Sequence, residues 1–267
     1  MNSAKVFQCL PGLVLLAAVT AAAQGPARLV WSDEFDRPGL PDPAKWAYQT
    51  GGHGWGNQEK QYYTEARAEN ARVENGHLLI TARREAFEGR EYTSARLVTA
   101  GRQTWRYGYF EIRAKLPCGR GTWPAIWMLG TDTSLGKWPA IGEIDIMEHV
   151  GHDPERVHAT IHCTAYNHTK GTQKGGFLRA PGVCADFHVY AVNWTPEFLE
   201  FYLDGRPYFR FANEGKTRAE WPFDQPFYLL LNVAVGGTWG GQKGVDDEAF
   251  PQTFAIDYVR VYDRKPE

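Results

Sequence analysis

Three carboxylates lie within six residues, in the segment Glu143-Ile144-Asp145-Ile146-Met147-Glu148. β-Branched residues alternate with the first two acids, and this pattern favours a β-strand. Side chains along a strand alternate between its two faces, so Glu143 and Asp145 point the same way and Glu148 points the other way. One extra residue in the strand, a β-bulge, would return Glu148 to the face of the other two acids.

The chemistry of such a cluster follows from the repulsion between like charges. Carboxylates packed this closely raise the pKa of at least one member, or share a proton. Two carboxyl groups with different protonation at one pH are what acid/base cleavage of a glycosidic bond requires. A half-buried or solvated edge strand has the same local pattern, so the six residues alone leave both interpretations open.

The elements that must position these acids are predicted to be short strands separated by turns. Asn75-Gly76 and Asp204-Gly205 each stand between two strand-like runs and predict hairpins. Helical periodicity is scarce, with a single turn expected at residues 247–250. The pattern predicts an all-β sandwich or barrel. The strand-like runs are residues 72–74, 77–83, 107–116, 157–162, 187–194, 198–203, 206–211, 228–235 and 254–262.

The start of the chain predicts export. Lys5 precedes an apolar run from Cys9 to Val19, and an Ala-x-Ala site follows it. We therefore predict a signal peptide over residues 1–23, cleaved after Ala23, and a secreted or periplasmic protein. The apolar run is too short to span a membrane comfortably as a permanent helix. Residues 24–267 are expected to form one domain.

Charge and composition limit the partners. The formal net charge is -2, and the lysines and arginines are scattered along the chain. This distribution gives no electrostatic argument for nucleic acid or for an anionic membrane surface. We expect a monomer that binds neither.

Three cysteines follow the predicted leader: Cys118, Cys163 and Cys184. An exported protein can keep a disulfide. Cys163 and Cys184 flank one Gly-rich excursion, so we predict that these two pair. Cys118 follows Pro117 in a separate turn and is left over, and three free thiols are the alternative. None of the cysteine spacings is that of a zinc or haem site.

The segment Gly142–Glu148 resembles the active-site signature of glycoside hydrolase family 16. More narrowly, it looks like that of the bacterial laminarinases, which are endo-β-1,3-glucanases. Six matches in the family's order are far more specific than any one of them, and they cover nearly the whole mature chain. The other five are Trp31–Phe35, Trp55–Thr64, Gly121–Leu129, Asn232–Trp239 and Asp257–Tyr262.

The resemblance implies a jelly-roll sandwich of two curved antiparallel sheets with an open cleft across the concave face. It also implies cleavage of internal β-1,3 bonds in laminarin-type β-glucans by double displacement with retained anomeric configuration. Glu143 would be the nucleophile and Glu148 the general acid/base, and Asp145 would orient and tune the nucleophile. The extra residue, Met147, is shared with laminarinases, agarases and carrageenases, whereas lichenases tend to have the shorter Glu-x-Asp-x-Glu form.

Aromatic residues make up 14% of the chain, and ten of them are Trp. They can pack in a sandwich core or stack on the apolar faces of sugars. Core packing is the alternative for Trp127, a surface role for Asn57 and Arg96, and a structural role for His162. Trp239 stands among glycines and is expected on a loop over the cleft. The predicted substrate-binding residues are Asn57, Arg96, Trp123, Trp127, Trp138, His162 and Trp239.

The resemblance also implies a structural calcium ion on the convex face. Glu34, the backbone oxygen of Gly76 and Asp257 match the positions that would bind it. Hard oxygen ligands suit calcium, and hydrogen-bonded carboxylates without an ion are the alternative. No cofactor is expected for catalysis, because the two-carboxylate mechanism needs no metal.

Three alternatives to an endo-β-1,3-glucanase stay open. The first is another polysaccharide specificity, for mixed-linkage β-1,3-1,4-glucan or an algal galactan, although the Trp-rich segment favours glucan. The second is a non-catalytic glucan-recognition protein, which would typically lack the two glutamates that this chain has. The third is a transglycosylase, which would share the covalent intermediate.

Overall fold

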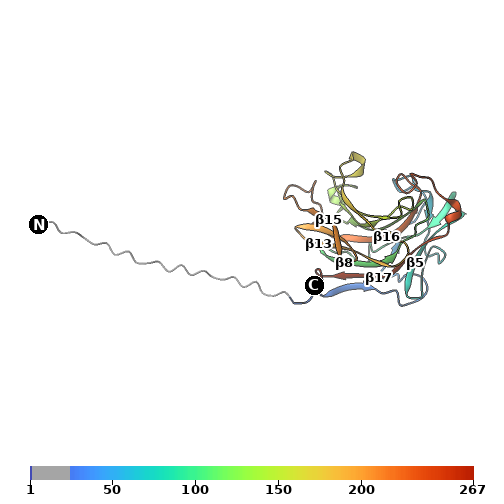
Figure 1. Ribbon diagram of the computed structural model, residues 1–267, viewed down its shortest axis with the longest axis horizontal. Coiled ribbons are helices and arrows are strands. Elements are labelled where there is room, and N and C mark those ends of the chain that lie inside the picture. Colours follow the sequence, from blue (N-terminus) through green and yellow to red (C-terminus); the bar gives the residue numbers. More distant parts are fainter. Residues whose placement is uncertain (2–24) are drawn as a thin grey trace.

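The structure is a computed structural model that describes Met1 and residues 25–267, so the predicted signal peptide lies outside the described residues. Two β-sheets pack face to face, as Figure 1 shows, in the predicted jelly-roll sandwich. Among the described residues the helical elements are single 3-10 turns at Thr133–Leu135, His168–Lys170 and Asp247–Ala249, the last where one turn was expected. None of these is long enough to cross a membrane.

The ten-stranded sheet has the order β15-β14-β13-β8-β17-β5-β6-β3, with β1 beside β17 and β4 beside β5. Its pairings are antiparallel except for β3 with β6. Its strands are β1 (Leu29–Asp33), β3 (Gln61–Tyr63), β4 (Ala71–Glu74), β5 (His77–Phe87), β6 (Arg90–Ser94), β8 (Gly108–Lys115), β13 (His188–Trp194), β14 (Phe198–Leu203), β15 (Arg206–Ala212) and β17 (Gln252–Tyr262).

The seven-stranded sheet has the order β12-β11-β10-β9-β16-β7-β2 and contains the acidic segment as β10. Its pairings are all antiparallel. Its strands are β2 (Ala47–Tyr48), β7 (Arg96–Val98), β9 (Thr122–Gly130), β10 (Glu143–Glu148), β11 (Arg156–His162), β12 (Lys174–Arg179) and β16 (Phe227–Val235).

Both turns predicted from Asn-Gly and Asp-Gly are present. Asn75 and Gly76 have φ values of 52° and 76° and join β4 to β5. Asp204 and Gly205 have φ values of 49° and 74° and join β14 to β15. Two successive residues with positive φ match the right-handed twist of the strands they connect, which explains the sequence preference.

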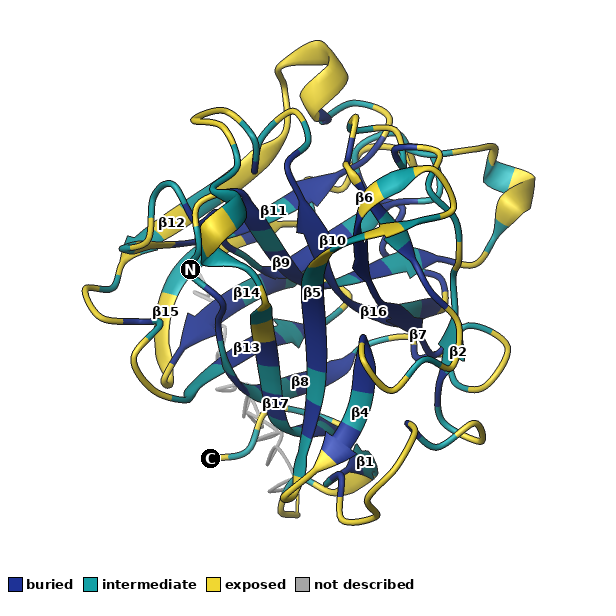
Figure 2. Cartoon of the chain, turned by 90° about the vertical axis from the view of Figure 1, so that its right-hand side faces the viewer, coloured by how far each residue is buried: buried dark blue, intermediate teal, exposed yellow. Residues whose placement is uncertain are grey.

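The core lies between the two sheets. Figure 2 shows buried residues along the central strands of both layers, with exposure confined largely to loops and edges. β16 is buried along nearly its whole length, as its apolar sequence predicted. β9 alternates instead, because Trp123, Trp127 and Leu129 are only partly buried while Ile126 and Met128 are fully buried. One face of the seven-stranded sheet therefore remains available to a ligand.

The bulge predicted in the acidic strand is present. Asp145 lies opposite Trp127 and Met147 opposite Ile126, so the additional residue against β9 is Ile146 rather than Met147, which was expected to be the extra one. The pairing with β11 shifts over the same stretch. Ile146 and Met147 are both fully buried in the core. The bulge therefore turns two consecutive side chains inward and lets Glu148 face outward with Glu143 and Asp145.

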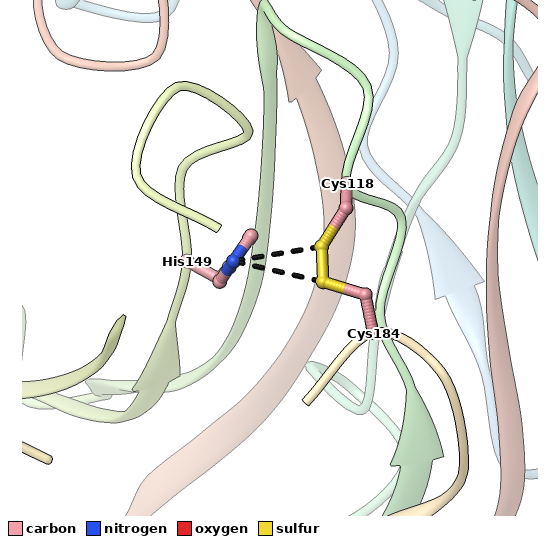
Figure 3. A group of neighbouring side chains, drawn as sticks. All are labelled: Cys118, His149 and Cys184. Atoms are coloured by element: carbon pink, nitrogen blue, oxygen red, sulfur yellow. Dashed lines mark hydrogen bonds between the residues drawn. A yellow bond between two sulfur atoms is a disulfide. The ribbon is translucent and has the colours of Figure 1, made fainter. Parts of the chain in front are cut away.

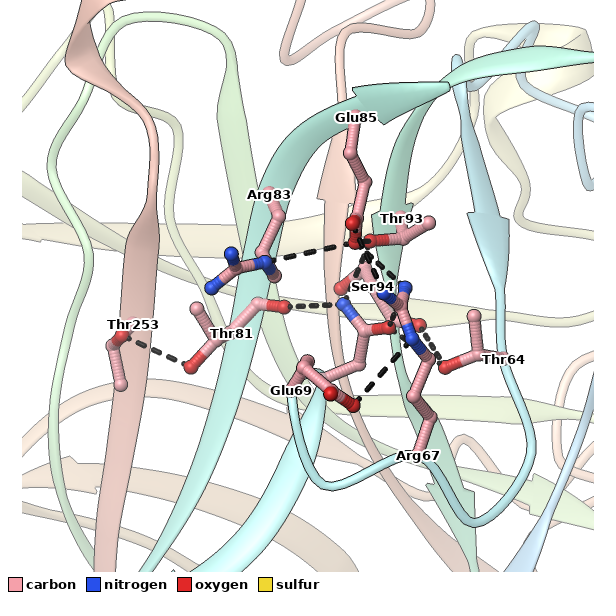
Figure 4. Close-up of polar contacts among 10 residues, drawn as sticks. Thr64, Arg67, Glu69, Thr81, Arg83, Glu85, Thr93, Ser94 and Thr253 are labelled. Atoms are coloured by element: carbon pink, nitrogen blue, oxygen red, sulfur yellow. Dashed lines mark hydrogen bonds and ion pairs between the residues drawn. The ribbon is translucent and has the colours of Figure 1, made fainter. Parts of the chain in front are cut away.

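A partly buried polar network holds the segment after β3 against β5 and β6 (Figure 4). The guanidinium of Arg67 donates to both carboxylate oxygens of Glu85, at 2.6 and 3.0 Å. The amide of the fully buried Asn70 donates to the Thr81 carbonyl at 3.0 Å and to the Thr93 hydroxyl at 2.9 Å. Satisfying these groups offsets the cost of burying them and fixes residues 67–70 against β5 and β6.

The predicted disulfide pairing is wrong. Cys118 pairs with Cys184 (Figure 3), their Cα atoms lying 6.1 Å apart. Cys163 is a buried free thiol. Cys118 follows β8 and Cys184 precedes β13, and these two strands are hydrogen-bonded neighbours. Cys163 follows β11 in the other sheet. Proximity across a sheet, rather than proximity in sequence, decides the pairing.

Candidate active site

The three acids of β10 face the open side of the seven-stranded sheet. Glu143 and Glu148 are partly exposed and Asp145 is 3% exposed, and all three line a cleft. The cleft has two lobes that share both glutamates, Asn57, Trp123 and His168. We refer to the lobe over β9, β16 and β7 as the β9-side pocket and to the lobe over β11 and β12 as the β12-side pocket.

Strand register arranges the cleft in rows that run across the sheet. Directly paired residues of neighbouring strands share a face. One row passes from Asn232 through Ala125, Glu148 and His158 to Phe177. A second row, one step along the strands, passes from Leu230 through Trp127, Asp145 and Thr160 to Gly175.

Aromatic side chains dominate the β9-side pocket. Trp55, Trp127 and Trp138 line it together with Arg96 and Asn232. The Arg96 guanidinium lies 4.5 Å from the Trp55 ring centroid and 4.6 Å from that of Trp127. Cation–π contacts on two rings fix this side chain, and its Nε donates to Gln49 at 2.7 Å. Trp127 therefore belongs to the cleft rather than to the core.

A chain of hydrogen bonds under this pocket fixes its floor. The Trp127 indole donates to the Asn232 side-chain oxygen at 2.7 Å, and the Asn232 amide donates to the Tyr63 hydroxyl at 3.0 Å. Tyr63 donates at 3.2 Å to the carboxyl of Glu59, which is 5% exposed. Burial raises the pKa of Glu59, against the effects of its hydrogen-bond donors and of Arg96.

Each glutamate receives a hydrogen bond from one indole. Trp138 donates to Glu143 Oε2 at 2.9 Å, and Trp123 donates to Glu148 Oε1 at 3.1 Å. The ring nitrogen Nε2 of His162 lies 3.4 Å from Asp145 Oδ2 and 3.7 Å from Glu143 Oε1. That Asp145 oxygen has no hydrogen-bond partner.

Burial raises the pKa of each of these acids above its ordinary range. It raises the pKa of Glu148 to about 7, and together with the negative charge of Asp145 it raises the pKa of Glu143 to about 8. The pKa of Asp145 is raised well above its usual range, again mainly by burial. Close like charges titrate as a group, so the cluster holds protons at neutral pH.

The hydrogen bonds indicate where these protons belong. An indole N–H donor stabilises the ionised form of the carboxyl that accepts from it. Glu143 has such a donor, whereas Asp145 Oδ2 has none and is more deeply buried. These contacts favour a proton on Asp145 and an ionised Glu143, and they oppose the burial and the Asp145 charge that raise the pKa of Glu143.

All seven residues predicted to bind substrate line the cleft. Asn57 and Trp123 border both lobes, and the others divide between them, with Arg96, Trp127 and Trp138 in the β9-side pocket and His162 and Trp239 in the β12-side pocket. Sequence reasoning missed Asn232, His168 and Phe177 as lining residues. Strand parity pointed to His158 and Thr160, but nothing in the sequence fixed which face β12 presents.

The predicted calcium ligands occupy one region of the ten-stranded sheet, but their oxygens are engaged. Arg260 donates to both oxygens of Glu34, at 3.0 and 2.8 Å. Arg113 donates to Asp257 at 2.5 Å, and His77 lies 3.6 Å from the other oxygen of Asp257. As arranged, these residues do not fit a calcium ion, because binding would have to draw a carboxylate away from its arginine. The calcium site stays a prediction.

The chain matches the family described as "Glycosyl hydrolases family 16" over residues 58–260. It is 64% identical over 241 residues to a protein named "Beta-glucanase" from Rhodothermus marinus, covering 88% of this chain and 84% of that protein. It is also similar to the crystal structure of the laminarinase from Rhodothermus marinus, with 62% identity and a TM-score of 0.88 over 90% of this chain and 98% of that one.

Another similar structure is the laminarinase catalytic domain of Thermotoga maritima. It is 44% identical, with a TM-score of 0.82, and the match covers 90% of this chain and 100% of that one. A third, SCLam, is described as a non-specific endo-β-1,3(4)-glucanase with a β-glucan oligosaccharide at its active site, and it is 50% identical with a TM-score of 0.85 over 91% and 99% of the chains. The family match and these identities together with the cleft acids show that this chain is a glycoside hydrolase of family 16.

Proposed function

We propose that the protein is an exported endo-β-1,3-glucanase that cleaves laminarin-type β-glucans with retention of anomeric configuration. The observation that carries the proposal is the set of three β10 carboxyls that share one face on the floor of an open, Trp-lined cleft. An open cleft admits the middle of a polymer, and indole faces suit pyranose rings. The similar proteins named laminarinase or glucanase support the same substrate class.

Each acid has a role in this mechanism. Glu143, held ionised by Trp138, attacks the anomeric carbon and forms a glycosyl ester while the bond to the leaving sugar breaks. Glu148 is protonated below pH about 7 and gives that proton to the leaving oxygen. It then takes a proton from water, which cleaves the ester. Asp145 keeps the shared proton and limits the negative charge beside Glu143.

The catalytic test uses Glu143→Gln and Glu148→Gln on laminarin. Each variant should lose hydrolysis by roughly a thousandfold or more, because one removes the nucleophile and the other the proton donor. Binding of laminarin should persist in both variants. Product analysis by NMR during the first turnover should show the β-anomer for the wild type. Near-normal turnover by either variant would remove that residue from the mechanism.

Specificity needs a separate comparison, because SCLam is described as a non-specific endo-β-1,3(4)-glucanase. Release of reducing ends should be fastest on laminarin, slower on lichenan and absent on agarose. Faster cleavage of lichenan would indicate a mixed-linkage enzyme. Chain lengths of the products distinguish hydrolysis from transglycosylation, and the mass of the exported protein tests cleavage after Ala23.

A further inference from the structure

Phe177 is an aromatic side chain that packing alone does not explain. It is 56% exposed, and the other large apolar side chains with high exposure among the described residues are aliphatic or Met1. It lies on β12, at the edge of the seven-stranded sheet, and it lines the β12-side pocket. A single exposed apolar residue is unremarkable on a surface, but this one borders the catalytic cleft.

Strand register places Phe177 in line with the catalytic machinery. It lies directly opposite His158, which in turn lies directly opposite Glu148. The ring centroids of Phe177 and His158 are 5.9 Å apart, and those of His158 and Trp239 are 5.0 Å apart. Trp239 also meets Trp123, the donor to Glu148, at 5.5 Å. An aromatic surface thus runs from Glu148 to the sheet edge.

The neighbouring strand position is left bare. Gly175 shares the face of Phe177, two residues earlier, and lies opposite Thr160. A Cβ there would meet the Ala159 carbonyl oxygen at 2.7 Å and the Thr160 hydroxyl at 3.2 Å. No side chain can therefore stand at this position, and Thr160, Gly175 and Phe177 together line the β12-side pocket. The Arg156 guanidinium lies 4.8 Å from that ring's centroid, and a cation on one face leaves the opposite face for a ligand.

The contacts of the two glutamates indicate which part of the substrate lies here. Glu148 is held by Thr160, which lines the β12-side pocket and not the β9-side pocket, and by Trp123, which borders both lobes. Glu143 is held by Trp138, which lines the β9-side pocket. The acid that protonates the leaving oxygen therefore belongs to the β12 side. The sugar units released with that oxygen should lie over β11 and β12.

We propose that Phe177, together with His158 and Trp239, forms a stacking platform for the glucosyl units on the leaving-group side of the cleaved bond. This inference rests on the proposed function, since it takes Glu148 as the proton donor. The ligand is the reducing-end part of a β-glucan, and in the second half-reaction it is an acceptor sugar that competes with water. Phe177 is a binding residue and takes no part in the chemistry.

The test compares Phe177→Ala and Phe177→Tyr with a matched control, Phe187→Ala. Phe187 also carries an arginine 4.8 Å from its ring centroid, but it lies beside the ten-stranded sheet and lines neither lobe. The substrate is β-1,3-glucohexaose labelled with ¹⁸O at its reducing end. Mass spectrometry of the fragments gives the frequency with which each bond is cleaved, and initial rates give kcat/KM.

Phe177→Ala should move cleavage toward the reducing end, because fewer units gain from binding on the leaving side. It should lower kcat/KM for the hexaose about five- to tenfold, as expected for one lost stacking contact. The ratio of transglycosylation to hydrolysis should fall as well. Phe177→Tyr should keep the cleavage pattern, kcat/KM and the transglycosylation ratio near their wild-type values. Phe187→Ala should leave all three unchanged. Melting temperature should stay constant for Phe177→Ala, since the ring is exposed.

Three results would overturn the platform. One is an unchanged cleavage pattern in Phe177→Ala, which would make Phe177 ordinary surface. Another is a shift toward the non-reducing end, which would place the leaving sugar over β9 instead. The third is an equal effect of Phe187→Ala. Each of these leaves laminarin hydrolysis by the wild type intact, whereas failure of the proposed function would show as no hydrolysis of laminarin or of the hexaose.

Discussion

At the scale of single residues, the three carboxyls of β10 differ in the hydrogen-bond donors that each one faces. Glu143 and Glu148 each accept an indole N–H, whereas one oxygen of the more deeply buried Asp145 accepts nothing. The spacing of the acids predicted that they would share a face and perturb one another. The sequence could not predict which tryptophan would serve which acid, because Trp123 and Trp138 reach β10 from a neighbouring strand and from the loop before it.

Replacing Trp123 by Phe should shift the alkaline limb of the pH–activity profile. The indole N–H stabilises ionised Glu148, so its removal should raise the pKa of Glu148 above about 7. A hydrogen bond to a charged group corresponds to about one pKa unit. The fall in kcat/KM at high pH should therefore move up by about one unit. Trp138→Phe is the matched control, and it should move the acid limb instead.

Removing the charge of Glu148 should stabilise the fold at high pH. Its pKa is raised in the folded state, so its contribution to stability is complete below the unfolded value of about 4.5 and is lost as the pH rises through about 7. Glu148→Gln should therefore melt near the wild-type temperature at pH 5 and above it at pH 8. Because Glu148 keeps some solvent contact, we expect on the order of 1 kcal/mol. An equal difference at both pH values would contradict this.

At the scale of elements, the bulge in β10 was predictable because the period of a strand is fixed. Three acids spaced two and three residues apart can share a face only if one residue is added. The exposed face of β12 was not predictable, because its sequence mixes glycines with apolar and charged residues. The cysteine pairing failed for a related reason, since β8 and β13 are neighbours in space but distant in sequence.

Met147 should contribute to stability through core packing beneath the bulge. It is fully buried although its neighbour Glu148 faces the cleft. Met147→Ala should lower the free energy of unfolding by about 2–5 kcal/mol, whereas Met147→Leu, of similar volume, should cost less than about 1.5 kcal/mol. Urea unfolding followed by tryptophan fluorescence measures both. A small effect of the alanine variant would mean that the bulge collapses around the lost side chain.

The predicted calcium site can be tested at the carboxylates of Glu34 and Asp257, which contact Arg260 and Arg113. If an ion binds there, millimolar Ca²⁺ should raise the melting temperature of the wild type after treatment with EDTA, through preferential binding to the folded state. Asp257→Asn should abolish the response. No response in the wild type would leave Glu34 and Asp257 as partners of Arg260 and Arg113 alone.

At the scale of the whole molecule, the disulfide between Cys118 and Cys184 closes a covalent loop that contains the catalytic strand β10. Cys118 and Cys184 are 66 residues apart, and the fully buried His149, adjacent to Glu148, lies against them (Figure 3). Burial lowers the pKa of His149 to about 4, so it is neutral at physiological pH. The family resemblance predicted the two-sheet architecture, but this covalent link depends on the packed fold.

Cys118→Ser should destabilise the protein by about 4 kcal/mol, the chain entropy expected for a loop of this length. Cys163→Ser should have a smaller effect, because it breaks no covalent link. Alkylation in denaturant without reductant, followed by peptide mapping, should label Cys163 and leave Cys118 and Cys184 unlabelled. Labelling of Cys184 together with protection of Cys163 would reverse this assignment.

The order of strands in the seven-stranded sheet has a consequence for the products of the enzyme. A glucan that lies along the rows crosses one strand about every 4.8 Å, so the number of strands limits how much of the polymer is held. In the proposed mechanism the cleaved bond lies over β10, which has β11 and β12 on one side and β9, β16, β7 and β2 on the other. The sheet therefore extends further on the side that, in the proposed mechanism, keeps the glycosyl ester. A polymer bound by its middle would therefore contact fewer strands on the β12 side, and the released fragment would leave from that side.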